Sequence, residues 1–175
     1  LLDGKILVMP TPRLSEGFLL LDPSRIPRGQ LEYASTIRGA FIYGRKTHPR
    51  DLPRIDLIIT GSVAATRNGL RLGKGGGYSE LEYAILLEYD KIDPDITIAT
   101  NIHDLQLVDR LPRDPYDLTL DIIATPTKLI KVQAVRERPR GIIWELLDRE
   151  KIEENAILRE LYILRDNGAR KFLNR

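Results

Sequence analysis

The sequence contains no cysteine, two histidines and one methionine. The absence of cysteine excludes disulfide bonds, a thiolate nucleophile and a cysteine-ligated zinc site, and two histidines are too few for a histidine-rich metal site. No apolar run approaches the roughly 18 residues that a membrane helix needs, and we expect no signal peptide. With 175 residues, of which 42% are hydrophobic and 30% charged, the composition predicts one soluble, cytoplasmic globular domain with no membrane partner.

Charge and composition add two weaker indications. The 11 prolines, the lack of cysteine and the dense arginine and glutamate residues are typical of a thermophile. The net charge of +2 is small but unevenly spread, since residues 128–175 carry 12 basic and 8 acidic side chains, a net charge of +4. This bias is typical of a solvated helical face, and a nucleic-acid or protein partner is the alternative.

Short apolar runs rich in β-branched residues alternate with segments of helical periodicity. We predict strands at 5–9, 55–60, 95–100, 118–125 and 128–132, and helices at 79–89, 143–148 and 156–165. Within residues 11–54 we expect short strands at 18–21 and 40–43 and a helix at 31–38. The alternation predicts an α/β fold with a mostly parallel sheet, and the continuously apolar strands predict helices on both of its faces, hence three layers.

The segment 69–80, GLRLGKGGGYSE, is rich in glycine and precedes a predicted helix. Ser79 and Glu82 have the spacing of a capping box, which marks a helix start. Glycine N–H groups, the positive end of the helix dipole and the cations Arg71 and Lys74 together suit a phosphate group. The segment does not match the Walker loop, because Gly75 rather than Ser or Thr follows Lys74, and it does not match G-x-G-x-x-G, because Tyr78 stands at the sixth position after Gly73 and Gly75. A surface loop before a capped helix is the alternative.

Four polar residues outside the loop are further candidates. His103 and Asp104 follow a predicted strand, where parallel sheets bind ligands, and could orient a substrate or act as acid and base. A hydrogen-bonded turn is the alternative for this pair, and Gln106 is a weaker candidate for substrate contact. Asp121 lies within an apolar strand, where a buried carboxylate needs a partner. It therefore belongs either to a functional site or to an ion pair with arginine or lysine.

Residues 71–78, RLGKGGGY, resemble the R-L-G-x-G-x-G-Y-Y-D signature of 5-formyltetrahydrofolate cyclo-ligases, also known as methenyltetrahydrofolate synthetases. The strand at 56–61 and the segment 109–127 resemble the flanks of that signature. Further resemblance, to the methenyltetrahydrofolate synthetase domain-containing branch, lies at 61–64, 77–84, 103–106 and 138–144. The resemblance covers most of residues 1–165 and implies a three-layer fold like that of sugar-phosphate isomerases and CoA-transferases.

The resemblance implies an enzyme that uses ATP and Mg²⁺ to close 5-formyltetrahydrofolate, or a similar folate, to 5,10-methenyltetrahydrofolate. The formyl oxygen is phosphorylated, N10 attacks the activated carbon, and phosphate leaves. On this mapping the catalytic residues are Arg71, Lys74 and Tyr78. The nucleotide-binding residues are Arg71, Gly73, Lys74, Gly75, Gly76, Gly77, Tyr78 and Ser79. The two Mg²⁺ ligands are Glu80 and Asp121, since Mg²⁺ prefers carboxylate oxygens and water.

The sequence departs from the family pattern at three places. Ser79 replaces the second tyrosine of the signature, and Glu80 replaces its aspartate. The family's N-terminal helix, which carries a lysine and an arginine that contact ATP, has no counterpart before the strand at 5–9. We therefore expect a poor cyclo-ligase, with Leu7 exposed unless an N-terminal extension or a second subunit of a homo-oligomer covers it. The alternatives are a lapsed family member that binds nucleotide or RNA, and an interaction module.

Overall fold

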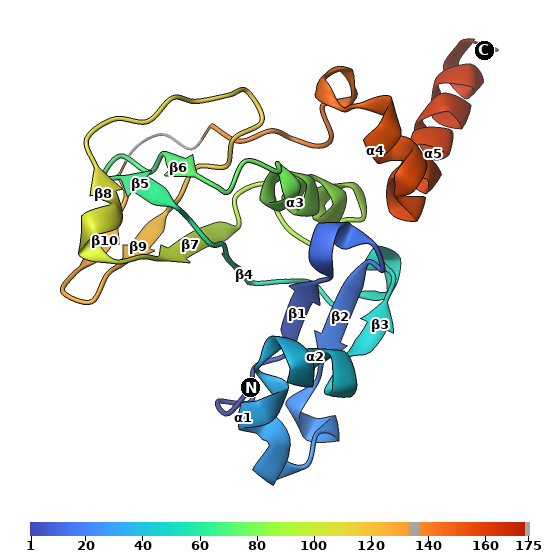
Figure 1. The fold of residues 1–175 in the computed structure, drawn as a ribbon. Helices are drawn as coiled ribbons and strands as arrows, with labels where there is room; N and C mark the ends of the chain where they lie inside the picture. Colours follow the sequence, from blue (N-terminus) through green and yellow to red (C-terminus); the bar gives the residue numbers. More distant parts are fainter. Residues whose placement is uncertain (134–136, 174–175) are drawn as a thin grey trace. The chain divides into compact units, whose positions relative to one another are not determined.

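The structure, a computed structural model, describes residues 1–133 and 137–173 and divides the chain into two compact units (Figure 1). One unit comprises Leu1–Leu52 and Leu146–Arg175, and the other comprises Pro53–Glu145. That residues 1–175 form a single domain stays a prediction. Among the described residues, no helix combines the length and the apolar character that crossing a membrane requires.

The first unit combines a small antiparallel sheet with helices. Its strands β1 (Leu7–Pro10), β2 (Phe18–Leu21) and β3 (Arg45–Thr47) pair in that order, with Leu7 opposite Leu21 and Phe18 opposite Thr47. Its α-helices are α1 (Leu31–Ala34), α2 (Ile37–Tyr43), α4 (Arg149–Glu154) and α5 (Ala156–Leu173). Short 3₁₀ turns lie at Pro12–Leu14, Pro23–Arg25, Arg28–Gln30 and Pro49–Asp51.

The core of the first unit forms between β2 and the segments that follow it. Its buried side chains are Leu19, Leu21, Ile26, Leu31, Ala34 and Ala40. Removing this apolar surface from water is the main favourable contribution to folding here. Leu7 in β1 is exposed, as predicted.

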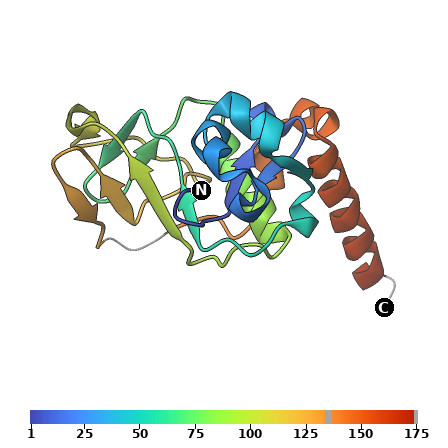
Figure 2. The same cartoon turned by 90° about the horizontal axis from the view of Figure 1, so that it is seen from below.

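The long helix α5, seen end to end in Figure 2, is capped by the residue before it. The Asn155 side-chain oxygen accepts hydrogen bonds from the backbone N–H groups of Ile157 and Leu158 at 3.0 and 3.1 Å. Its amide nitrogen donates to the carbonyl of Leu14 at 3.2 Å. The cap therefore satisfies two helix-end N–H groups and ties the helix to the N-terminal segment of the same unit.

In the second unit β4 (Leu57–Ile59) pairs with β7 (Thr97–Asn101), and helix α3 (Tyr78–Glu88) is the last element of the connection between these two strands. β4, β7 and β9 (Ile122–Ala124) are parallel, and β10 (Leu129–Lys131) adds an antiparallel edge, in the order β10-β9-β7-β4. A second sheet has the order β6 (Arg71–Leu72), β5 (Ala64–Thr66), β8 (Leu107–Val108). A 3₁₀ turn spans Asp104–Gln106.

The predicted α/β class is confirmed, as mixed sheets accompanied by helices. The strands divide among three sheets, and parallel pairing joins β4, β7 and β9 in one sheet and β5 and β8 in another. The strand β4 is less enclosed than its apolar sequence predicts, because Leu57 and Ile59 are exposed whereas Ile98 of β7 is fully buried. Continuous apolar character therefore correctly predicts burial for β7 and not for β4.

The strand predicted at residues 40–43 is wrong, because this segment is the second half of helix α2. The Thr36 hydroxyl caps α2 by accepting from the Gly39 N–H at 3.1 Å. Gly39 also lets the helix approach α1 closely, since a Cβ there would lie 1.9 Å from the carbonyl oxygen of Tyr33. The cap and this close approach outweigh the strand preference of the aromatic and β-branched residues that follow.

Several further segments are shorter than predicted. The strand predicted at 118–125 is reduced to β9, because Leu120 donates its N–H to the carbonyl of Gly69 at 2.8 Å and the Thr119 carbonyl accepts from Arg138. The Leu120 N–H and the Thr119 carbonyl therefore cannot form hydrogen bonds to a neighbouring strand. The helix predicted at 143–148 is a single 3₁₀ turn at Trp144–Leu146.

Candidate functional site

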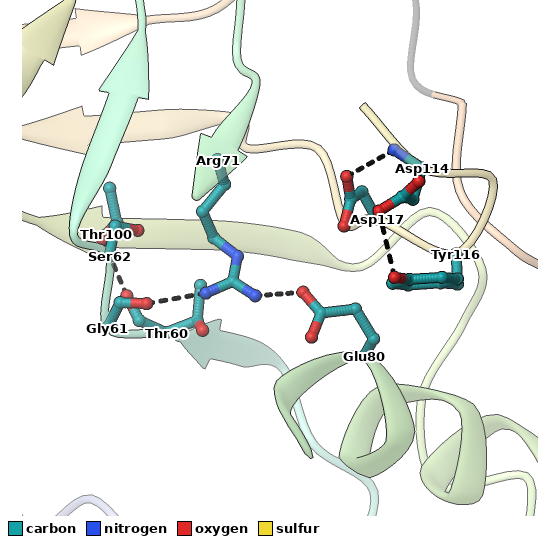
Figure 3. A network of polar contacts seen from close by, with 9 residues as sticks. All are labelled: Thr60, Gly61, Ser62, Arg71, Glu80, Thr100, Asp114, Tyr116 and Asp117. Atoms are coloured by element: carbon teal, nitrogen blue, oxygen red, sulfur yellow. Dashed lines mark hydrogen bonds and ion pairs between the residues drawn. The ribbon is translucent and has the colours of Figure 1, made fainter. Parts of the chain in front are cut away.

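The glycine-rich loop connects β6 to α3, and its arginine lies beside the segment that follows β4 (Figure 3). Arg71 on β6 donates from Nη1 to the carbonyl of Gly61 at 2.7 Å. Its Nη2 pairs with the Glu80 carboxylate in the first turn of α3. The Arg71 side chain is 2% exposed and that of Glu80 is 11% exposed. The structure therefore brings two predicted site residues together as a buried ion pair.

One nitrogen of the Arg71 guanidinium makes no hydrogen bond in the described part of the chain. This nitrogen, Nε, is also buried. A buried donor without a partner costs about 1–3 kcal/mol. An oxygen atom of a bound ligand would remove that cost.

The backbone of the loop explains why its residues are glycine. Gly75 and Gly77 have φ values of 92° and 66°, in the left-handed region that favours glycine. A Cβ on Gly73 would lie 3.1 Å from Nη1 of Arg71, so the loop passes directly over the guanidinium. A Cβ on Gly76 would lie 2.8 Å from the Tyr78 ring. The loop is therefore shaped by its contacts with Arg71 and Tyr78, while Lys74 is exposed.

The predicted capping box is wrong. Helix α3 begins at Tyr78 with Gly77 as its cap residue, and no side chain caps it. Ser79 is therefore the second residue of the helix. The left-handed turn at Gly77 sets the helix cap two residues earlier than the Ser79–Glu82 pattern predicts, and it leaves the first N–H groups of α3 without a side-chain cap.

Two acidic residues outside the prediction lie near the ion pair. Burial, and then the charge of Glu80, raise the pKa of Glu82 to about 7. Burial raises the pKa of Asp117, the hydrogen bond from the Asp114 N–H lowers it, and the charge of Glu80 raises it again. Asp117 accepts from the Asp114 N–H at 2.7 Å (Figure 3). The sequence carries little signal for Glu82, because positions 80 and 82 of a helix do not share a face. Asp117 is distant from the glycine loop along the chain.

We expect the stability of the protein to fall between pH 5 and pH 7 because of Glu82. Its pKa of about 7 in the folded chain exceeds its ordinary value of 4.5, so the folded state binds more protons than the unfolded state in this range. The free energy of unfolding should decline by roughly 2 kcal/mol as the pH rises from 5 to 7. In Glu82→Gln this decline should disappear, as measured by urea denaturation at each pH.

Asp90→Asn, at an exposed position of the same unit, is the control for the pH experiment. Asp90 has a φ of 55°, which asparagine also adopts readily. This variant should keep the decline of the wild-type chain. An unchanged slope in Glu82→Gln would contradict the prediction.

Asp121 is held by an arginine distant in sequence. Its Oδ2 accepts from Nη2 of Arg138 at 2.6 Å and from the Ile98 N–H at 2.7 Å. Arg138 also donates to the carbonyls of Thr119 and Ile96, from Nε at 3.0 Å and from Nη1 at 2.6 Å respectively. Of the two alternatives for Asp121, the structure therefore contains the ion pair.

Glu80 and Asp121, the predicted Mg²⁺ ligands, each face a different arginine. Among the described residues, no group of three or more histidine, cysteine, aspartate or glutamate side chains is placed to hold a metal ion. The role of Glu80 and Asp121 as Mg²⁺ ligands stays a prediction. The buried Nε of Arg71 is a donor, and the start of α3 is the positive end of a helix dipole.

The predicted substrate residues His103, Asp104 and Gln106 form a hydrogen-bonded turn. The His103 Nδ1 accepts from the Leu105 N–H at 3.2 Å, and the Gln106 Oε1 accepts from the His103 N–H at 2.7 Å. Hydrogen bonds from Thr127 and then Thr125 lower the pKa of Asp104. Their role in substrate binding stays a prediction.

Gln106 also fixes the backbone beside Arg71. Its Nε2 donates to the carbonyls of Ser62 and Val63 at 3.1 and 2.9 Å. The Thr100 hydroxyl donates to the Thr60 carbonyl at 2.7 Å and lies 2.8 Å from the Ser62 hydroxyl. Contacts on both sides therefore hold the segment whose Gly61 carbonyl accepts from Arg71.

These features define an α/β protein with a glycine-rich loop beside a buried arginine, and the chain belongs to the 5-formyltetrahydrofolate cyclo-ligase family. The profile of that family matches residues 1–126. This range includes the loop, Arg71, Glu80 and Asp121. The family membership predicted from residues 71–78 is therefore confirmed.

Individual relatives agree with the family assignment. The methenyltetrahydrofolate synthase domain-containing proteins of Danio rerio and Homo sapiens are 32% and 35% identical over 171 and 162 residues, or 95% and 90% of this chain. The chain spans 44% and 42% of their lengths, less than half of either relative. The 5-formyltetrahydrofolate cyclo-ligase of Escherichia coli is 37% identical over 78 residues, 45% of this chain and 40% of that protein.

A solved structure, the NMR structure of Aquifex aeolicus 5,10-methenyltetrahydrofolate synthetase, is 21% identical with a TM-score of 0.47. The match covers 79% of this chain and 64% of that one.

Proposed function

We propose that this protein uses ATP to cyclise a 5-formyl folate to its 5,10-methenyl form. The observation that carries the proposal is the family match over residues 1–126, which includes the loop above the buried Arg71. The shape of that loop supports a phosphate ligand independently of the family name. The predictions of a nucleic-acid partner and of a homo-oligomer stay predictions.

In this proposal the residues of the loop hold the nucleotide phosphates. The N–H groups of residues 73–78 would donate to phosphate oxygens, and Arg71 and Lys74 would neutralise their charge. ATP supplies the phosphoryl group that turns the formyl oxygen into a leaving group. Positioning and charge stabilisation dominate phosphoryl transfer, so the buried guanidinium is the group with the greatest influence on it. Tyr78 at the start of α3 would border the nucleotide or the pterin.

The test is an absorbance assay for methenyl product from 5-formyltetrahydrofolate, with and without ATP. Wild-type protein should form product only with ATP, and Arg71→Ala should form far less. Calorimetry should show ATP binding to Arg71→Ala weakened by about 1.5–3 kcal/mol, roughly 10- to 150-fold, the range for a hydrogen bond to a charged group.

Arg67→Ala is the matched control for the Arg71 substitution. Arg67 is exposed in the turn between β5 and β6, and its loss should leave both product formation and ATP affinity unchanged. Equal ATP affinity in Arg71→Ala and wild-type protein would place the nucleotide elsewhere.

A second function, nucleotide binding without turnover, is favoured by one observation. Arg71 already has a carboxylate partner in Glu80, so its guanidinium is less available to stabilise a transferring phosphoryl group. A protein of this kind would bind ATP in calorimetry and form no methenyl product. The same pair of assays therefore separates the two functions.

A further inference from the structure

The two buried arginines of the second unit differ in how completely their donors are used. Arg138 donates from all three side-chain nitrogens, to the carbonyls of Thr119 and Ile96 and to Asp121. Arg71 donates from Nη1 and Nη2, while its Nε is buried and has no hydrogen-bond partner in the part of the chain that the structure describes. Each side-chain nitrogen of Arg138 therefore has an acceptor, whereas the Nε of Arg71 keeps capacity for one.

The carboxylate partner of Arg71 lies next to the glycine loop at which the proposed nucleotide would bind. Glu80 is in the first turn of α3, directly after the glycine loop, and its carboxylate pairs with Nη2 of Arg71 (Figure 3). The loop also passes over the guanidinium, because a Cβ on Gly73 would lie 3.1 Å from Nη1. An oxyanion that approaches through this loop therefore meets a guanidinium already paired with a carboxylate.

Releasing Glu80 from Arg71 leaves its charge in a favourable position. A carboxylate in the first turn of a helix is stabilised by the positive end of the helix dipole. The side chain is also not fully enclosed, being 11% exposed. When a ligand oxygen replaces Glu80, Arg71 thus still has a negatively charged partner. The released Glu80 carboxylate still lies near the positive end of the helix dipole.

We propose that Glu80 is an internal competitor for Arg71, which a phosphate-class anion must displace to bind at the glycine loop. The proposal deepens the proposed function and rests on it for the identity of the ligand. Binding of a polyphosphate is then weaker in the wild-type chain than in a chain whose residue 80 carries no charge. Glu80 acts as a specificity-determining residue. Only an anion with several acceptor oxygens makes enough hydrogen bonds to Arg71 and the loop to replace the Glu80 carboxylate.

The test is calorimetric titration of wild-type and Glu80→Gln protein with inorganic tripolyphosphate. Glu80→Gln should bind at least about tenfold more tightly, which corresponds to about 1.4 kcal/mol. Asp90→Asn removes the same charge from an exposed position and should change the affinity by less than about twofold, which separates displacement from the loss of net charge.

Two further measurements test the competition between Glu80 and the anion if Glu80→Gln does not fold. Glu80→Asp keeps the charge but shortens the side chain, so it should also bind tripolyphosphate more tightly than wild-type protein. In the wild-type chain, the NMR signal of the Arg71 Nε–H, identified by its loss in Arg71→Ala, should shift when tripolyphosphate is added. Unchanged affinity in both Glu80 variants, or an unchanged Nε–H signal, would overturn the proposal.

A double variant tests whether Glu80 weakens tripolyphosphate binding through its pairing with Arg71. In the Arg71→Ala background, Glu80→Gln should no longer tighten binding, and a gain that persists would show that Glu80 acts by general repulsion. Methenyl product from wild-type protein without tighter binding in Glu80→Gln would refute the competitor role alone. Tighter binding in Glu80→Gln without methenyl product would refute the proposed enzyme activity alone.

Discussion

Replacing Asp121 with alanine should lower the free energy of unfolding by about 3–5 kcal/mol, the range for removing one partner of a buried ion pair. The substitution removes the acceptor of two hydrogen bonds, from Arg138 at 2.6 Å and from the Ile98 N–H at 2.7 Å. The Arg138 side chain is 3% exposed, so its charge would remain buried without its carboxylate partner. Most of the cost arises from this uncompensated guanidinium.

Urea denaturation of Asp121→Ala and two comparison variants measures the effect. Arg113→Ala breaks an ion pair with Glu137 that is more exposed, and it should cost less than about 1 kcal/mol. The double variant Asp121→Leu with Arg138→Met replaces both charges by apolar groups and should be more stable than Asp121→Ala. A loss below about 1 kcal/mol in Asp121→Ala would show that the pair contributes little to stability.

Leu158→Ala should lower the free energy of unfolding by about 2–5 kcal/mol, the range for truncating a buried leucine. Leu158 is completely buried in the first unit. It lies in the first turn of α5, where its N–H donates to the Asn155 cap at 3.1 Å. The capped helix end cannot shift freely into the space left by the leucine, so much of the cavity should persist.

Leu164→Ala is the matched control for the truncation of Leu158. It makes the same chemical change in the same helix, at a position that is 54% exposed. Its effect should stay within about 0.5 kcal/mol, as for a surface substitution. Equal losses of stability in the two variants, measured by urea denaturation, would contradict the burial of Leu158.

The candidate site divides into a part that the sequence predicts and a part that it does not. The glycines and Arg71 are adjacent along the chain, so their pattern alone indicates a phosphate loop and the family. The partners of the charged residues are not local, because Asp121 and Arg138 are 17 positions apart and Arg71 and Glu80 are nine apart. Which cation meets which carboxylate therefore depends on how the strands and α3 are packed.

The sequence by itself determined the α/β class, the approximate positions of β2, β7, β10 and α3, the glycine loop and the family, because each rests on short-range periodicity or on a contiguous motif. Tertiary structure decided that residues 40–43 are helical, since the close approach at Gly39 requires two helices in place. It also decided that Glu82 has a raised pKa, because desolvation and the charge of Glu80 act only after the chain has folded. Burial and charge pairing are properties of three-dimensional distance, which the order of residues does not contain.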